Sequence, residues 1–365
     1  MTTPIDNPDE LPEAIAGDET QGSSPKSGSQ SPGEMREAIA RAVLDARDVL
    51  VTGHRNPDGD SMGSILALGL ILGHLGKSYT LYGPDPVAFQ FRGLPLWEKV
   101  QDRILETASF DLVIAVDTGD ESLLGPLVPP RSRRGALAVI DHHASSRRFG
   151  DLCWRDPSAA AAGVLVAGLA ETLQVPMTAE LAAPLWCALY TDTGGFRYSS
   201  TDAQVLRLAA RLVESGLSPW DVSVGLYEQS PLERIRLMGL ALSSLSLSAS
   251  GQIACLLITE EMLWVTGADH TMLDGIINYA RGIAGVEVAV QILQQGDKCR
   301  VGLRSKGRVD VGLLALGLGG GGHSNAAGCV LPGTPAEVEA EVMSVLEAAL
   351  APPDGVLSAP QPGGG

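Results

Sequence analysis

The sequence is poor in cysteine and in basic residues, and it has no long hydrophobic run. Its five cysteines are scattered without a close pair, which argues against a disulfide framework or a zinc site. They fit small buried side chains in a reducing compartment. The longest apolar stretch, residues 65–75, is too short to cross a bilayer, and the acidic, polar start is not typical of a signal peptide. We therefore expect a soluble cytoplasmic protein with no membrane partner.

Negative charge dominates the chain. Its 26 lysines and arginines are set against 43 aspartates and glutamates, so the formal net charge is −17. A general basic surface that follows long nucleic acids is therefore not expected, because Lys and Arg supply most of the affinity for phosphate backbones. Short anionic substrates stay open, since bound divalent cations reverse the local field.

The two ends of the chain differ in composition from its middle. Residues 1–34 are rich in Pro, Ser, Gly and acid and cannot bury enough apolar surface to offset their ordering entropy. We predict a disordered acidic tail there and a second disordered tail over 351–365. Between the tails the length allows two domains, which we place at 35–216 and 244–350, with 217–243 as a connector.

Strand and helix patterns alternate in both predicted domains. In the first domain the apolar runs predict strands at 48–53, 79–82, 111–120 and 136–143. Helical spacing there predicts helices at 35–47, 60–75, 159–174, 178–191 and 202–216. The second domain has strand patterns at 253–259, 286–293 and 299–304, and helical patterns at 269–282 and 335–350. Apolar strands alternating with helices predict an α/β fold whose parallel sheet is covered on both faces.

Acidic and imidazole side chains follow three of these predicted strands directly. His54, Asp58 and Asp60 come after the first strand, Asp117 after another, and Asp141, His142 and His143 after a third. Asp192 follows a helical apolar stretch and precedes a Gly-Gly turn. Ligands of open parallel sheets bind at the carboxyl ends of the strands, so these groups should converge. Their mutual repulsion would be costly without cations among them. Mixed carboxylate and imidazole ligands suit Mn²⁺, with Mg²⁺ or Co²⁺ as alternatives, and there are enough ligands for two ions.

Each motif also has a plain structural interpretation. A run such as HRNPDGD can be an ordinary turn, Asp117 can cap a helix, and His143 can be a core-edge histidine bonded to backbone. The metal-site hypothesis is favoured because all the motifs are expected at one sheet edge.

Four ordered motifs resemble those of the DHH phosphoesterase superfamily. They read HRNPDGDSMGS, AVDTGD, IDHH and YTDTGGF along the chain. The later segment GLRSKGRVDVGLLALGLGGGGHSNAAGCVL is similar to the DHHA1 substrate-binding domain. The resemblance implies a parallel-sheet DHH domain, a helical connector and a smaller α/β DHHA1 domain, with an active-site cleft between the two domains.

The resemblance also implies roles for the site residues. One Mn²⁺ ion would be held by His54, Asp58 and Asp117. The second would be held by Asp60, Asp117, His142 and Asp192, with Asp117 shared. His143 would contact the scissile phosphate, and Asp141 would orient a neighbouring imidazole.

In the second domain, Arg304 is expected to clamp a phosphate with Ser305 beside it. The glycine run that includes Gly320, Gly321 and Gly322 can form an anion-binding nest, and His323 follows it. The alternatives are a surface charge at Arg304 and a flexible hinge at the glycines.

The arrangement of domains resembles that of bifunctional oligoribonucleases that also remove phosphate from 3′-phosphoadenosine 5′-phosphate. We therefore predict a Mn²⁺-dependent hydrolase that degrades very short RNA to mononucleotides and has this phosphatase activity. The alternatives are a cyclic-di-AMP or pApA phosphodiesterase, a RecJ-like single-strand exonuclease, and a nucleotide sensor without catalysis. The run DPSAAAAGVLV (156–166) departs from the polar residues common in the family, which leaves substrate preference open. A homodimer, the polarity of digestion and the choice between RNA and DNA also stay open.

Overall fold

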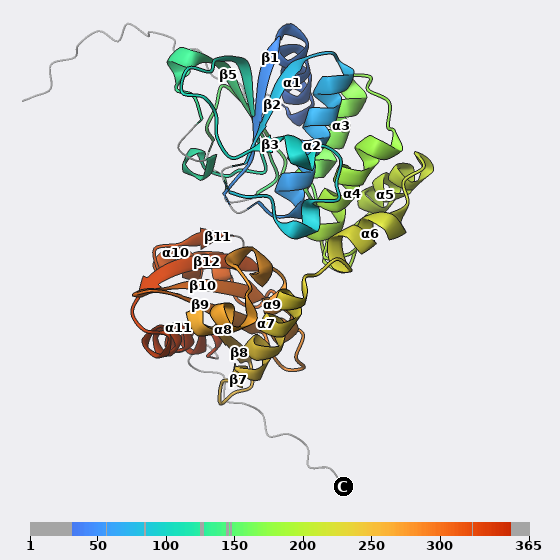
Figure 1. The fold of residues 1–365 in the computed structure, drawn as a ribbon. Helices are drawn as coiled ribbons and strands as arrows, with labels where there is room; N and C mark the ends of the chain where they lie inside the picture. The colour runs from blue at the N-terminus through green and yellow to red at the C-terminus, as the bar shows by residue number, and fades with distance from the viewer. Residues whose placement is uncertain are drawn as a thin grey trace, which may run out of the picture. The chain divides into compact units, whose positions relative to one another are not determined.

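The computed structural model describes residues 31–351 except 56, 84, 125–127, 144–145, 147 and 323. Most of both predicted tails therefore lies outside the described residues. The described part forms two six-stranded sheets, each with its own helices and core (Figure 1). None of its helices has the length and the apolar composition needed to span a bilayer.

The first sheet is entirely parallel and has the strand order β3-β2-β1-β4-β5-β6. Its strands are β1 (Asp48–Thr52), β2 (Ser78–Tyr82), β3 (Val100–Gln101), β4 (Phe110–Val116), β5 (Arg134–Asp141) and β6 (Leu152–Arg155). The four strands predicted from apolar runs are confirmed as β1, β2, β4 and β5. The short edge strands β3 and β6 were not predicted, because two to four residues give too little pattern to detect.

Five helices belong to this sheet, and they agree with the predicted ones to within a few residues. They are α1 (Pro32–Asp45), α2 (Gly59–His74), α3 (Ala162–Thr172), α4 (Ala179–Asp192) and α5 (Ala203–Glu214). One face of the sheet packs on these helices in a large core that includes Val51, Ile114 and Ile140. On the opposite face, the residues that pack on the strands come from connections, for example Ile104, Leu124 and Phe149. Both faces are covered as predicted, but in the described residues the second cover comes from connections, including the 3-10 helix Glu121–Leu124, and not from α-helices.

Helices α2 and α4 approach each other closely because glycines stand where they meet. A Cβ atom built at Gly63 of α2 would lie 2.4 Å from the carbonyl oxygen of Pro184 and 2.9 Å from the amide nitrogen of Ala188, both in α4. At Gly59 it would lie 2.4 Å from the Thr191 side chain. These contacts fix the first turn of α2 against the last turn of α4.

The predicted helical connector is confirmed as α6 (Pro219–Tyr227) and α7 (Leu232–Ser243). The second sheet has the order β11-β12-β10-β9-β8-β7, in which β8 and β9 are parallel and the other pairs antiparallel. Its strands are β7 (Ser246–Leu247), β8 (Ile253–Ile258), β9 (Val288–Gln295), β10 (Lys298–Ser305), β11 (Gly321–Gly322) and β12 (Ala326–Pro332). Its helices are α8 (Glu260–Thr266), α9 (Ile276–Arg281), α10 (Val311–Gly317) and α11 (Pro335–Leu350).

The prediction of one helix over 269–282 is wrong. The segment forms a 3-10 turn at His270–Leu273 and then α9. Gly275 separates them with a φ of +78°, a left-handed conformation that glycine adopts without steric cost and that ends a right-handed helix.

Candidate metal centre

The predicted acidic and imidazole groups come together at the carboxyl edge of the first sheet. The loops that carry them follow β1, β4 and β5, which are neighbours in the sheet. Asp192 reaches the same place as the last residue of α4. Asp58 caps the N-terminus of α2, where its Oδ1 accepts the backbone N–H groups of Asp60 and Ser61, both at 3.0 Å.

Two histidines turn the same ring nitrogen towards the carboxylates. His54 Nδ1 lies 2.7 Å from the carbonyl oxygen of Arg55, and His142 Nδ1 lies 3.1 Å from that of Ala159. A carbonyl oxygen can only accept, so each Nδ1 is the donor, and the lone pair of the neutral ring is on Nε2. This is the arrangement in which imidazole binds metals, with the other ring nitrogen fixed by a hydrogen bond.

Asp117 lies between the two histidines. Its Oδ2 is 3.4 Å from His54 Nε2, and its Oδ1 is 3.6 Å from His142 Nε2. Oδ1 is buried and has no hydrogen-bond partner among the described residues, which is costly for a carboxylate oxygen. The residue also has a φ of +54°, a strained value for a residue other than glycine, and such strain is concentrated at functional sites.

Three groups of ligand atoms are close enough to share an ion. They are His54, Asp58 and Asp117, then Asp60, His142 and Asp192, and finally Asp117, His142 and His143, with the ligand atoms of each group within 4.8 Å of one another. His142 Nε2 lies 3.3 Å from Asp192 and 3.5 Å from Asp60, longer than a good hydrogen bond. Ligands about 2.1 Å from one cation are separated by about 3.0–3.5 Å, so these gaps fit a bound ion. The residues therefore fit a metal centre.

The alanine run that departed from the family pattern serves the site through its backbone. Helix α3 begins after Ala161, which has no capping side chain of its own. Asp60 supplies the cap instead, accepting the N–H groups of Ala162 at 2.6 Å and Gly163 at 2.9 Å. The carbonyl of Ala159 in the same run orients His142. These contacts were not predicted from the sequence, because almost every residue type offers the same backbone N–H and carbonyl groups.

The electrostatics of the site favour cations. Asp60 is fully buried, and this burial is the largest cause that raises its pKa well above the ordinary value. The negative charges of Asp117 and Asp192 raise the same pKa further. Burial and neighbouring carboxylates likewise raise the pKa of Asp192. Burial alone would lower the pKa of His54, but Asp117 and Asp58 outweigh it and raise that pKa. Positive charge bound among these groups would relieve the repulsion.

His143 is held by Asp141 beside the metal ligands. Its Nδ1 donates to Asp141 Oδ1 at 2.7 Å, and Ser146 donates its hydroxyl to the other oxygen of Asp141. Arg155, at the end of β6, donates its Nε–H to the backbone carbonyl of His143 at 2.9 Å. Burial opposes ionisation of Asp141, but the bond from His143 outweighs it and lowers the pKa of that carboxyl. Ser146 and Arg155 were not singled out in the sequence, since neither belongs to a strand-end pattern.

The predicted phosphate-binding residues lie in the second sheet and its glycine loop. Arg304 is partly buried on β10, where Nη1 donates to the carbonyl of Leu303 at 3.0 Å. Ser305 is buried, and its hydroxyl donates to Glu287 and accepts the N–H of Gly307. That hydroxyl therefore shapes the loop after Arg304.

The glycine run is required for close packing of strands. A Cβ atom at Gly320 would lie 2.1 Å from the carbonyl oxygen of Gly328. Gly321 and Gly322 form β11 against β12, so these two residues are an ordered part of the sheet. His323 lies outside the described residues.

Two family models match the chain. The DHH family, N-terminal domain, matches residues 48–189, and the DHHA1 domain matches residues 257–351. The chain belongs to the DHH family of phosphoesterases, which confirms the resemblance seen in the motifs.

The relatives include named enzymes. The chain is 35% identical over 286 residues to the bifunctional oligoribonuclease and PAP phosphatase NrnA of Thermus thermophilus, covering 78% of this chain and 84% of the relative. It is 27% identical over 300 residues to the protein of the same name from Bacillus subtilis, covering 80% of this chain and 92% of that relative. The crystal structure of an exopolyphosphatase-related protein from Bacteroides fragilis matches this chain with a TM-score of 0.79 at 23% sequence identity. The match covers 87% of this chain and 96% of the other chain, so the two proteins share the same fold.

Proposed function

We propose that this phosphoesterase is a Mn²⁺-dependent enzyme that degrades very short RNA to mononucleotides. We further propose that it releases phosphate from 3′-phosphoadenosine 5′-phosphate, both in the cytoplasm. The observation that carries the proposal is the convergence of three His/Asp ligand groups on one sheet edge, with the buried, unpartnered Asp117 Oδ1 among them. The two relatives named oligoribonuclease and PAP phosphatase support the choice of substrates.

The proposed metal ligands follow the clusters. One ion is assigned to His54, Asp58 and Asp117, and a second to Asp60, Asp117, His142 and Asp192. This assignment is supported by the ligand distances and by the unpartnered Asp117 oxygen, while Mn²⁺ is proposed from the mixture of carboxylate and imidazole. Cations bound there would neutralise charge on the phosphoryl group and make a water molecule more acidic.

His143 is the proposed catalytic contact to the reacting phosphate, and Asp141 is the proposed positioning residue. Their short Nδ1–Oδ1 bond supports these roles, because it fixes the orientation of the imidazole ring beside the metal ligands. The protein's contribution at this point is to hold the imidazole in a fixed orientation beside the reacting group.

Arg304, the glycines at 320–322 and His323 are proposed to bind the nucleotide. The guanidinium fork of Arg304 suits a phosphate, and the glycine backbone can approach an anion without Cβ atoms in the way. We propose a supporting role for Ser305, whose hydroxyl is already used by Glu287 and Gly307.

The test is a substrate panel on the purified full chain. Labelled RNAs of 2 to 24 nucleotides, 3′-phosphoadenosine 5′-phosphate and cyclic-di-AMP are incubated with and without Mn²⁺, and Asp117→Ala controls for contaminating nucleases. We expect Mn²⁺-dependent turnover that is fastest on the shortest RNAs, together with release of phosphate. Equal turnover at every length would contradict the preference for short RNA.

The same panel separates the alternatives. Faster turnover of cyclic-di-AMP than of dinucleotide RNA would favour the cyclic-dinucleotide phosphodiesterase. Tight binding with no hydrolysis of any substrate would favour the sensor. The homodimer stays a prediction, which size-exclusion chromatography with light scattering can test.

A further inference from the structure

A hollow at the edge of the first sheet is not used by the site described above. Its volume is about 440 Å³, within the range of small-molecule sites, and its walls include Val87, Arg92, Trp97, Glu98, Asp102 and Arg103. Val87 lies in the connection after β2, and Asp102 and Arg103 directly follow β3. The hollow, which we call the β3 pocket, therefore lies towards the carboxyl edge, where the metal ligands also lie.

Trp97 gives the pocket a fixed aromatic wall. Its side chain is partly buried and packs against the large core of the first domain. The preceding residue, Leu96, has a φ of +67°, a strained conformation that the surrounding packing maintains. A rigid aromatic surface loses little conformational entropy when a flat ligand stacks on it, and nucleic acid bases of any sequence can do so.

The charge of the pocket is balanced. Arg92 donates its Nε–H to the carbonyl oxygen of Val87 at 3.2 Å, which holds its guanidinium in the wall. The Arg103 side chain is 84% exposed, and its Nε lies 3.7 Å from Asp102. These two arginines offset Glu98 and Asp102, so the lining has no net charge in a chain of −17. A phosphate backbone meets less repulsion here than over most of the surface, and exposed guanidinium groups can bond to it or stack on a base.

The pocket is linked to the metal loop. Asp85, one residue before the lining residue Pro86, pairs with Arg55 at 3.9 Å, and Arg55 directly follows the metal-ligand candidate His54. Strands β2 and β1 separate β3 from β4, which leads into the shared ligand candidate Asp117, so the pocket lies about 14 Å to the side of that residue at a strand spacing of about 4.8 Å. Stacked nucleotides advance about 3.4 Å each, so that distance corresponds to about four nucleotides.

We infer that the β3 pocket binds a base of a single-stranded RNA, about four nucleotides from the reacting phosphate, by stacking on Trp97. This inference rests on the proposed function for its substrate. Under it, a dinucleotide is too short to reach the pocket, whereas a pentanucleotide reaches it. The pocket then determines which lengths of RNA the enzyme binds tightly.

The test compares Trp97→Leu, which keeps apolar packing, with Trp97→Phe, which keeps an aromatic ring. The matched control is Trp264→Leu on α8, where the side chain is 83% exposed and far along the chain from the pocket. Affinity for fluorescein-labelled pentaadenylate is measured by anisotropy without added metal, and kcat/KM is measured on dinucleotide and pentanucleotide RNA with Mn²⁺. Circular dichroism checks that each variant is folded.

We expect Trp97→Leu to weaken pentanucleotide binding by about 5- to 150-fold, the range for loss of one stacked base, and to leave dinucleotide turnover unchanged. Trp97→Phe should retain most of the affinity, and Trp264→Leu should match the wild type. Equal pentanucleotide affinity in Trp97→Leu and the wild type overturns the inference, as does an equal loss on both lengths. If the wild type hydrolyses no RNA but Trp97→Leu still loses binding, the pocket stands and the proposed function fails.

Discussion

Replacing Gly63 by alanine tests whether the packing of α2 against α4 positions the metal site. The new methyl group would lie 2.4 Å from the carbonyl oxygen of Pro184 and 2.9 Å from the amide nitrogen of Ala188. Both atoms belong to the backbone of α4, so the contact can be relieved only by moving that helix. Asp192 ends α4 and lies 3.3 Å from His142 Nε2, so the movement should disturb the ligand group.

The expected magnitude follows from two opposing effects. Alanine in place of glycine gains up to about 1 kcal/mol of helix propensity. Overpacking a rigid core costs about 1–3 kcal/mol. We expect the free energy of unfolding of Gly63→Ala to fall by up to about 2 kcal/mol overall, because the clashing backbone atoms cannot rotate away. Misplacing Asp192 should also weaken Mn²⁺ binding about tenfold, as loss of outer support does in metal sites.

Gly73→Ala is the matched control in the same helix. A Cβ atom there would meet only the Tyr79 ring at 3.5 Å, an ordinary contact, so this variant should gain about 0.5–1 kcal/mol. Urea denaturation gives both stabilities, and isothermal titration calorimetry gives the Mn²⁺ affinities. If Gly63→Ala is as stable as Gly73→Ala and binds Mn²⁺ as tightly, α4 is not held where we describe it.

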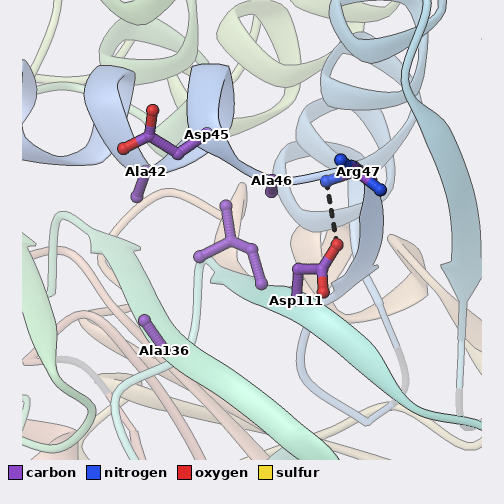
Figure 2. A pocket seen from close by; sticks show the side chains of 7 residues that line it. Ala42, Asp45, Ala46, Arg47, Asp111 and Ala136 are labelled. Atoms are coloured by element: carbon purple, nitrogen blue, oxygen red, sulfur yellow. Dashed lines mark hydrogen bonds between the residues drawn. The ribbon is translucent and has the colours of Figure 1, made fainter.

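Three further predictions concern the metal ligands, the opposite sheet edge and the last helix. Asp117→Ala should abolish hydrolysis and Mn²⁺ binding, because it removes the shared ligand. Arg304→Ala should instead raise KM more than it lowers kcat. Identical losses of kcat and of kcat/KM in the two folded variants would contradict this division of roles. At the amino edge of the first sheet, Asp111 accepts the N–H of Asp48 and also that of Arg47, the bond drawn in Figure 2. These two bonds lower the pKa of the Asp111 carboxyl. A carboxyl whose pKa is lower in the folded state stabilises the fold at pH values above its unfolded pKa of about 3.9, and this stabilisation is lost as the pH falls through the folded pKa. Asp111→Ala should therefore reduce Tm at pH 7 and reduce it less as the pH falls below about 4. An equal reduction of Tm at about pH 7 and about pH 3 would refute this. Thr334 and Glu337 form a capping box at the start of α11. Thr334→Ala should therefore lower the free energy of unfolding in urea by about 1 kcal/mol, whereas Thr334→Ser, which keeps the hydroxyl, should not. Equal losses of stability in the two variants would show that the hydroxyl does not stabilise the helix.

Part of the site was predictable because a parallel sheet brings its carboxyl ends together. The apolar runs that became β1, β4 and β5 end at acidic and imidazole residues, and that pattern is readable without coordinates. The structure brings His54, Asp58 and Asp117 within reach of one ion and Asp60, His142 and Asp192 within reach of another, whereas the prediction also put Asp117 in the second group.

The contacts that support these ligands were not predictable in the same way. The cap on Asp60 comes from the N–H groups of Ala162 and Gly163, which any residue except proline could supply. The β3 pocket depends on a two-residue strand and on the turn that contains Trp97. Both segments are too short to show a periodic pattern in the sequence.

The sequence alone determined the order of strands and helices in the first domain, the family motifs and the identity of the metal-ligand candidates. These features depend on local residue type and spacing, which the chain carries directly. Only the tertiary structure decided how closely α2 meets α4, which backbone groups serve Asp60 and His142, and that connections cover one face of the first sheet. Those features depend on contacts between segments that are distant in the chain, and such contacts form only when the whole core packs.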